Sequence, residues 1–413
     1  MNKHRSSFEW IDFAPRGGGF PPSGQAGPGK GDRDLQSVQC GHLLRVLAAS
    51  VLALVVAGCG GGATDGGSPD VVPAAPGASA SDTAALTAAA ALTVNITGVS
   101  VESPPVVNFT VTNQAGVGMA GLSSTDLHFN IAKLTPGSNG DPGTWQNYIN
   151  SAAGGAVQGS QERKTTSAGF VFGTLVNRGN GSYIYTFATD IKNATCPAPC
   201  TDADGRALDL SYQPGLTHRV TIQQGNSAYP RSTGVYDFVP NGGAGHKRDI
   251  VLTSTCNQCH AEVAMPGTTR IDTRLCVTCH NSGSSIAGTP GTPLDFKVMI
   301  HKIHYNNNGA ALPSVIAGTP YKVGGVDYSR VAFRQDVRNC TLCHDGTAGA
   351  ANATAQGDNW KTQPSMEACG SCHDNVYFGA APDPVKPYQV KPHTGGVMTD
   401  SSACALCHAA GKF

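Results

Sequence analysis

The sequence predicts an antiparallel β-sandwich or split-barrel domain, followed by a domain of short helices and loops that cannot build an apolar core of its own. Three observations predict this: period-two alternation in short segments, many turn-forming residues, and a cysteine motif that is repeated five times near the C-terminus. The 413-residue chain contains 52 glycines and 26 prolines, and only 14% of its residues are charged. This composition favours turns over long helices. The formal net charge is zero, which argues against a nucleic-acid binder.

Residues 1–58 read as an N-terminal extension and an export signal. An apolar run occupies residues 43–57, LLRVLAASVLALVVA, and it is shorter than the roughly 20 residues that a membrane-spanning helix needs. It leads into Gly58 and Cys59, and small residues directly before a cysteine are typical of a bacterial lipoprotein signal. We therefore expect Cys59 to be lipidated and to hold the protein at a bilayer surface. An uncleaved anchor and an ordinary signal with a chance cysteine are the alternatives.

Residues 59–92 are rich in Ala, Gly, Pro and Ser and contain no aromatic residue. Such a segment buries little apolar surface, so we expect a flexible tether. Its alanine-rich end has the composition for one or two helical turns.

Residues 93–243 read as antiparallel β-structure. Short segments alternate apolar and polar residues, the pattern of a half-buried strand, and residues 113–116 (NQAG) supply a turn. Because turn clusters recur and no long segment has the helical period, a sandwich or barrel follows. The clearest alternating residues are Val107/Phe109/Val111, Tyr183/Tyr185/Phe187 and His218/Val220/Ile222.

The β region contains a cysteine pair of its own, Cys196 and Cys200 in the sequence CPAPC. In an exported protein we expect these residues to form a local disulfide. A metal site is the less favoured alternative, because no further Cys/His pair has a matching spacing.

Residues 244–413 contain five copies of Cys-x-x-Cys-His. The spacing is typical of c-type haem attachment, in which two thiols add to the porphyrin vinyl groups and the histidine ligates the iron. A zinc site would leave the histidine of each copy unexplained. We therefore expect five c-type haems, and the motifs are Cys256/Cys259/His260, Cys276/Cys279/His280, Cys340/Cys343/His344, Cys369/Cys372/His373 and Cys404/Cys407/His408.

The length of this region predicts how the haems are packed. Residues 244–413 provide 170 residues for five motifs, or 34 for each. That is too little for separate apolar cores, so the porphyrins themselves must form the core of a haem-packed domain. Haems packed in this way lie close enough together for fast electron exchange.

Histidines outside the motifs are candidates for the sixth, distal iron ligands. Residues 295–304 (DFKVMIHKIH) predict a short helix that Asp295 caps, with His301 and His304 three residues apart on one side. Each could serve a different haem. The further candidates are His393, His246 and His218, with His128 ranked lower, and with Met265, Met299 and Met398 as fallbacks that would raise the haem potential.

Several segments match a known family. They are FNIAKLTPGSNGDPGTWQNYIN (129–150), GNGSYIYTFATD (179–190), HRVTI (218–222), the first two haem motifs and DFKVMIHKIHYNN (295–307). From about residue 95 to its C-terminus, the chain resembles the OmcA/MtrC group of outer-membrane multihaem cytochromes of metal-reducing bacteria.

The resemblance implies a β-barrel-like domain and a pentahaem domain with bis-histidine haems, anchored at the cell exterior. It also implies electron delivery to Fe(III) or Mn(IV) oxides, chelates or flavins, with other multihaem cytochromes or an outer-membrane barrel conduit as partners. His301 and His304 match the distal pair of the family. The chain departs from the family in having five motifs where ten are usual, and Pro266 where a distal histidine usually stands. We expect His246 to replace that ligand.

The leading function is an electron conduit, because an iron with two histidine ligands has no open position for substrate. Transfer must then be outer-sphere, through haem edges. The first alternative is a reductase of a small oxyanion, which would need one open iron flanked by polar side chains. The second is a subunit of a haem filament.

Overall fold

The computed structural model describes residues 79–137, 143–165, 170–286, 292–305, 321–328, 331, 333–384, 386 and 388–408. The expected signal, Cys59 and most of the tether lie outside the described residues. The chain divides into two units, Met1–Asp70 and Val71–Phe413, and every described residue belongs to the second. Within the described ranges no helix combines the length and the apolar character that a membrane span needs.

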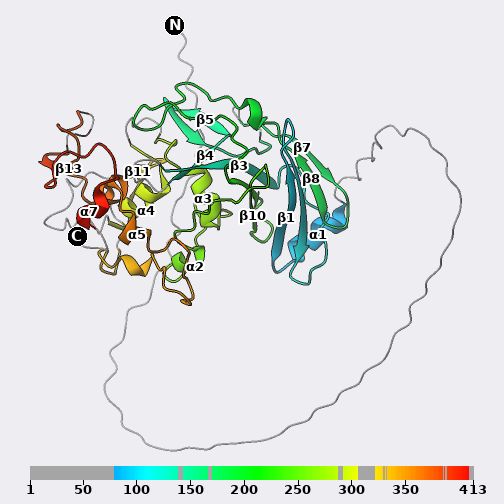
Figure 1. Cartoon of the computed structure of the whole chain (residues 1–413). Coiled ribbons are helices and arrows are strands. Elements are labelled where there is room, and N and C mark those ends of the chain that lie inside the picture. Colours follow the sequence, from blue (N-terminus) through cyan, green and yellow to red (C-terminus); the bar gives the residue numbers. More distant parts are fainter. Residues whose placement is uncertain are drawn as a thin grey trace, which may run out of the picture. The chain divides into compact units, whose positions relative to one another are not determined.

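Two four-stranded antiparallel sheets form the β domain (Figure 1). The first sheet has the order β1 (Leu92–Ser100), β2 (Val106–Asn113), β8 (Ser182–Thr186) and β7 (Thr174–Asn177). The second has the order β10 (Thr233–Phe238), β9 (His218–Gln224), β3 (Leu127–Thr135) and β4 (Thr144–Asn147). The predicted strands around Phe109, Tyr185 and Val220 are therefore confirmed.

The core of the β domain lies between the two sheets. Phe129 of β3 stacks on Tyr185 of β8 with ring centres 3.5 Å apart, and Phe109 stacks on Tyr183 at 5.2 Å. The sheets also approach along one edge, where a Cβ added to Gly234 of β10 would lie 2.8 Å from the Val94 side chain of β1. This contact closes one side of the sandwich, as the predicted split-barrel alternative requires.

The end of the expected tether belongs to the folded domain. Helix α1 (Ala80–Ala88) begins after Ser79, which forms a capping box with Asp82. Leu86 on this helix is fully buried in the β core. The expected boundary at residue 92 is thus too late, because one leucine among the alanines is enough to dock the helix.

Short elements make up the rest of the chain, and the longest described helix among them has ten residues. The β domain also contains β5 (Asn150–Ala153), β6 (Ala156–Gly159) and η1 (Ile191–Asn193). The C-terminal region contains α2 (Thr253–Cys256), α3 (Thr273–Cys279), α4 (Phe296–Tyr305), β11 (Lys322–Val323), β12 (Val326–Asp327), η3 (Cys340–Leu342), α5 (Asn359–Thr362), α6 (Met366–Cys372), β13 (Val376–Tyr377), β14 (Lys391–Pro392) and α7 (Cys404–His408).

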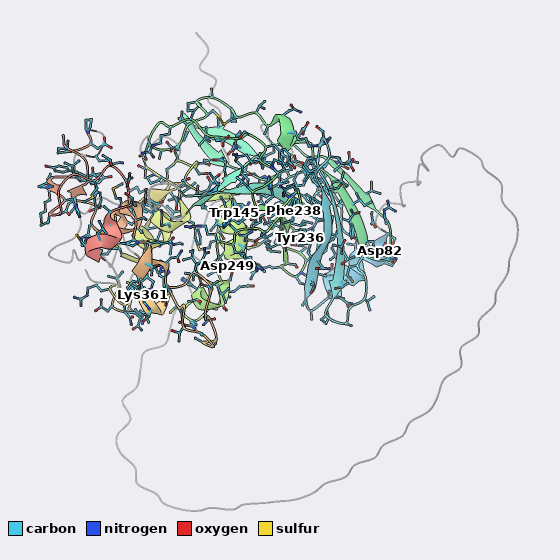
Figure 2. The ribbon with its side chains drawn as sticks, in the orientation of Figure 1. Asp82, Trp145, Tyr236, Phe238, Asp249 and Lys361 are labelled. Atoms are coloured by element: carbon cyan, nitrogen blue, oxygen red, sulfur yellow. A yellow bond between two sulfur atoms is a disulfide. The ribbon has the colours of Figure 1, made fainter. Side chains whose placement is uncertain are left out.

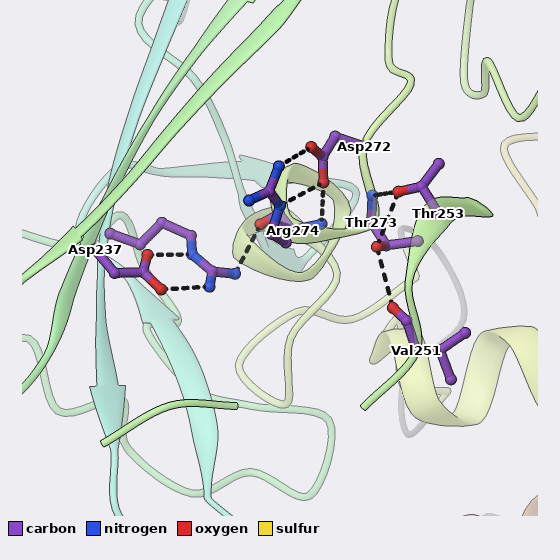
Figure 3. Close-up of polar contacts among 7 residues, drawn as sticks. Asp237, Val251, Thr253, Asp272, Thr273 and Arg274 are labelled. Atoms are coloured by element: carbon purple, nitrogen blue, oxygen red, sulfur yellow. Dashed lines mark hydrogen bonds and ion pairs between the residues drawn. The ribbon is translucent and has the colours of Figure 1, made fainter. Parts of the chain in front are cut away.

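Arg219 of β9 connects the C-terminal region to the second sheet through hydrogen bonds. Its guanidinium forms two bonds with Asp237, at 2.6 and 2.7 Å, and a third nitrogen donates to the Arg274 carbonyl of α3 at 3.2 Å (Figure 3). The same guanidinium lies 4.1 Å from the ring centre of Trp145, which is labelled in Figure 2. One buried cation therefore connects two strands of the sheet to the helix that carries the second motif.

Candidate haem-binding sites

Each motif occupies one tight helical turn. In the first four motifs, counted along the chain, the histidine N–H donates to the carbonyl of the first cysteine at 2.8–3.0 Å. This bond brings both thiols and the imidazole to one turn, as attachment to a single porphyrin requires. None of the ten motif cysteines, all of which lie in the described ranges, is joined to another cysteine.

The polypeptide itself covers these thiols unevenly. The second cysteine is exposed in the first, third and fifth motifs, at Cys259, Cys343 and Cys407. Cys276 of the second motif, in contrast, is buried. The β domain packs on the second motif, at Cys279. Haem attachment through all ten cysteines stays a prediction that rests on the spacing.

Helix α4 lies between several motifs. Asp295 caps it as predicted, because Asp295 Oδ1 accepts from the Lys297 N–H at 2.8 Å. Lys297 pairs with Glu367 of α6 at 3.2 Å, and Lys302 pairs with Asp374 at 3.6 Å. These ion pairs fix both ends of α4 against the fourth motif.

Three predicted distal histidines lie opposite motif histidines. The ring centres of His304 and His260 are 6.2 Å apart, and those of His301 and His344 are 6.1 Å apart. One helix therefore faces both the first and the third motif. The third pair joins His393 and His408, the histidine of the fifth motif, at 6.3 Å.

These separations match two imidazoles that share one metal. A ligating nitrogen lies about 2.0 Å from its metal and roughly 1.1 Å from its own ring centre, so two rings on opposite sides should be about 6.2 Å apart. In two of the three pairs one Nδ1 atom is engaged, since His304 donates to the Ile300 carbonyl at 2.8 Å and His393 to the Gly396 carbonyl at 3.1 Å. Such bonds leave Nε2 for the metal and orient the ring. In the pair of His301 and His344 neither Nδ1 atom has a partner among the described residues. The residues fit an iron held between two histidines.

Burial keeps the imidazoles neutral. Desolvation lowers the pKa of His301 and of His280 to about 4, and it also lowers the pKa of His304 and His344. A neutral imidazole is the form that ligates a metal.

Two other distal candidates do not lie at a motif. His218 is fully buried in the β domain, where its Nδ1 donates to the Leu216 carbonyl at 2.9 Å and its Nε2 lies 3.0 Å from the Tyr148 hydroxyl. With both nitrogens engaged, His218 has the contacts of a core residue, and this geometry gives no support to the prediction that it ligates iron. His246 is exposed, and among the described residues it has no ring contact with a motif histidine. Its predicted replacement of the ligand missing at Pro266 has no support in this geometry.

The second motif is embedded in the β domain, which the sequence did not predict. The side-chain amides of Asn130 on β3 and Asn147 on β4 lie 3.6 and 3.9 Å from Cys279 Sγ. A Cβ added to Gly159 would lie 2.8 Å from Cys279 Cα, so only glycine permits this approach. The sequence feature that could have indicated this packing is the presence of polar residues on the outer face of the predicted strands.

The motifs follow one another in the spatial order second, first, third, fourth and fifth. Thr273 before the second motif bonds to Thr253 before the first, as Figure 3 shows. Helix α4 faces the first and third motifs, and its ion pairs with Glu367 and Asp374 join it to the fourth. The N–H of Met366, just before the fourth motif, donates to the Ser401 hydroxyl, just before the fifth, at 3.1 Å. The five sites therefore form a continuous series.

The two cysteines of the CPAPC sequence do not belong to the haem motifs. Cys196 and Cys200 form a disulfide in the β domain, with Cα atoms 5.4 Å apart. Over the described part of the chain, no three His, Cys, Asp or Glu side chains gather in a way that would hold a single metal ion.

Comparison with known proteins agrees with this geometry. Residues 248–413 match the family described as outer membrane cytochrome MtrC/MtrF-like, domains II/IV. The multiheme cytochrome MtrC of Shewanella baltica (strain OS185) is 28% identical over 390 residues, which cover 91% of this chain and 47% of that protein. The chain is therefore similar to the OmcA/MtrC group of multihaem c-type cytochromes.

Solved structures show the same fold. The outer membrane decaheme cytochrome OmcA matches with a TM-score of 0.58 and 26% identity, over 77% of this chain and 48% of that one. MtrC from Shewanella baltica OS185 matches with a TM-score of 0.52 and 24% identity, over 77% and 43%. The chain spans about half the length of these relatives. The predicted order of a β domain and a haem domain is confirmed.

Proposed function

We propose that this chain binds five c-type haems and conducts electrons along them to extracellular acceptors by outer-sphere transfer. The observation that carries the proposal is the continuous series of five motifs, with histidine rings 6.1–6.3 Å apart at three of them. The acceptors are Fe(III) or Mn(IV) oxides, chelates or flavins, as the family resemblance implies.

The residues of the chain set how electrons move. When bound, c-type haem supplies a one-electron iron couple. At three motifs a pair of histidines would hold the iron and leave it no open position for substrate. These pairs are His304 with His260, His301 with His344, and His393 with His408. The carbonyls that accept from Nδ1 fix the rings and so limit reorganisation during transfer.

Localisation and partners follow from the family and the N-terminal segment. We propose that Cys59 is lipidated and anchors the chain at the outer membrane, facing the exterior, with a β domain that begins at α1 and ends at residue 243, and with residues 244–413 as the haem domain. Other multihaem cytochromes or an outer-membrane barrel would supply the electrons. Protease treatment of intact cells tests the orientation, since a chain that survives until the cells are broken faces inward.

The decisive experiment counts and oxidises the haems. Covalent haem is measured by mass spectrometry and the pyridine haemochrome assay, and the reduced protein is then mixed with an Fe(III) chelate or a flavin in a stopped-flow instrument. We expect five haems per chain and reoxidation of all of them. Fewer than five haems, or a fraction that stays reduced, would contradict a continuous conductor.

A further inference from the structure

A short segment beside β3 adds polar side chains to the face of the sheet that meets the second motif. The N–H of Phe129 donates to the Glu162 carbonyl at 2.9 Å, and the N–H of Glu162 donates to the Phe129 carbonyl at 2.8 Å. Glu162 is buried on the core side, where its carboxylate accepts from the Tyr185 hydroxyl. Because side chains alternate along extended backbone, Gln161 and Arg163 point to the opposite face.

This face carries two rows of three residues, which we call the polar wall. The antiparallel register places Arg163 beside His128 and Gln161 beside Asn130, while β9 places Gln223 opposite His128 and Thr221 opposite Asn130. All six residues have a buried polar atom without a hydrogen-bond partner, namely Arg163 Nε, His128 Nδ1, Gln223 Oε1, Gln161 Nε2, Asn130 Oδ1 and Thr221 Oγ1.

So many unpartnered atoms in one place indicate a polar ligand. Native proteins leave only a few buried polar atoms unsatisfied, and these are normally scattered. Gln223 lies near enough to His128 to raise the pKa of the His128 imidazole. Even so, neither His128 Nδ1 nor Gln223 Oε1 forms a hydrogen bond of normal geometry. The polar wall therefore has the composition of a binding surface rather than of a core.

Two arginines give the polar wall a positive charge. Arg270 Nη2 lies 3.4 Å from Gln161 Oε1, and the guanidinium of Arg163 lies 3.7 Å over the Phe170 ring. In the described ranges neither arginine forms an ion pair with a carboxylate. Burial lowers the pKa of Arg163, and the charge of Arg270 lowers it further. Both arginines are half-buried, and Arg270 Nη1 also donates to the Pro266 carbonyl at 2.8 Å. Two like charges near one another are stabilised by an anion that lies between them.

The polar wall lies at the second motif. Asn130 contributes its amide to the contact with Cys279 Sγ at 3.6 Å. Arg270 is close enough to His280 that its charge, after burial, lowers the pKa of that imidazole. A group attached to Cys276 and Cys279 would thus lie beside the face of the sheet that carries Asn130 and Arg163, and near Arg270.

We propose that Arg163 and Arg270 form a carboxylate-binding site that holds the propionates of the second haem against the β domain. This inference rests on the proposed function, because it needs a haem on the second motif. Each propionate is an anionic carboxylate, and the planar guanidinium matches a carboxylate with two parallel hydrogen bonds. A free oxyanion offers the same chemistry and is the alternative source.

The test uses the full haem-loaded chain and the variants Arg163→Gln and Arg270→Gln, with Arg178→Gln as the matched control. Arg178 lies on the β7–β8 hairpin of the first sheet and carries the same charge. Potentials of individual haems are followed by redox titration with electron paramagnetic resonance. We expect the midpoint potential of one haem to fall in each of the two variants, since an uncompensated carboxylate stabilises Fe(III). The control should leave all potentials unchanged.

Conservative variants and a ligand titration complete the test. Arg163→Lys and Arg270→Lys keep the charge but lose the planar fork, so their potentials should lie between those of the wild type and of the glutamine variants. Nitrite and sulfite are titrated into the wild type, with no effect expected. A saturable shift at one haem that the glutamine variants abolish would assign the site to a free oxyanion and overturn the propionate assignment.

Failure of this inference is distinct from failure of the proposed function. If five haems are bound and no potential moves in either glutamine variant, only the carboxylate site is refuted. If fewer than five haems are bound, the conductor itself is refuted, whatever the arginine variants show.

Discussion

His304→Ala removes one imidazole of the pair that His304 forms with His260. In the described part of the chain, no other histidine ring contacts His260, so nothing nearby replaces the lost ligand. Alanine has the highest helix propensity, which preserves α4. One iron of five should therefore become high-spin, and the reduced variant should bind one more carbon monoxide per chain than the wild type. His301→Ala should do the same at the third motif, and the double variant should add two.

The measurement is a carbon monoxide titration followed at the Soret band, with electron paramagnetic resonance to count the high-spin iron. His246→Ala is the matched control, because this exposed histidine has no described contact with a motif histidine and its loss should change neither signal. If His304→Ala binds no additional carbon monoxide, the ring pair does not mark an iron site. If His246→Ala binds more, an exposed residue is a ligand and the geometric reasoning fails.

Three further predictions concern the β domain. Arg219→Ala leaves the Asp237 carboxylate without its ion-pair partner and should lower the free energy of unfolding by about 3 kcal/mol in a urea titration. A loss below about 1 kcal/mol would contradict a stabilising role for this pair. His218→Gln should lower it by about 1–3 kcal/mol and leave the visible spectrum unchanged, whereas a change of spin state would restore His218 as a ligand. Burial raises the pKa of Tyr183 to about 12, while an unfolded tyrosine ionises near pH 10. The neutral Tyr183 side chain therefore contributes its full stabilisation of the fold below about pH 10, and this contribution is lost as the pH rises toward about 12. Tyr183→Phe should therefore make the decrease of Tm at alkaline pH less steep.

Local sequence determined the elements whose pattern is complete within a few residues. The alternation around Phe109 and Tyr185 defined strands because a strand needs only period two and one buried face. The helix with His301 and His304 was equally predictable, since its cap and its apolar side lie within ten residues. The five motifs were recognisable for the same reason, as their chemistry depends on a spacing of a few residues.

The tertiary structure decided which histidines face which motifs. His218 alternates with Val220 and Ile222, and that pattern is the same for a core residue as for a residue that faces outward. Strand β9 is buried on both sides, by the first sheet and by the C-terminal region, so periodicity could not say what each side meets. The spacing of the motif could not predict which thiols the polypeptide covers either. Cys259 and Cys407 are exposed and Cys276 is buried, although all three belong to motifs of the same pattern.

The sequence by itself determined the kind of protein: the attachment motifs, the β strands before them, and one helix that presents two histidines. The tertiary structure alone decided that His304 faces the first motif and His301 the third, and that Arg163, His128 and Gln223 form one row. These residues come together from segments that are far apart in the chain. Their contacts depend on sheet register and on the docking of α3 and α4, which no short stretch of sequence encodes.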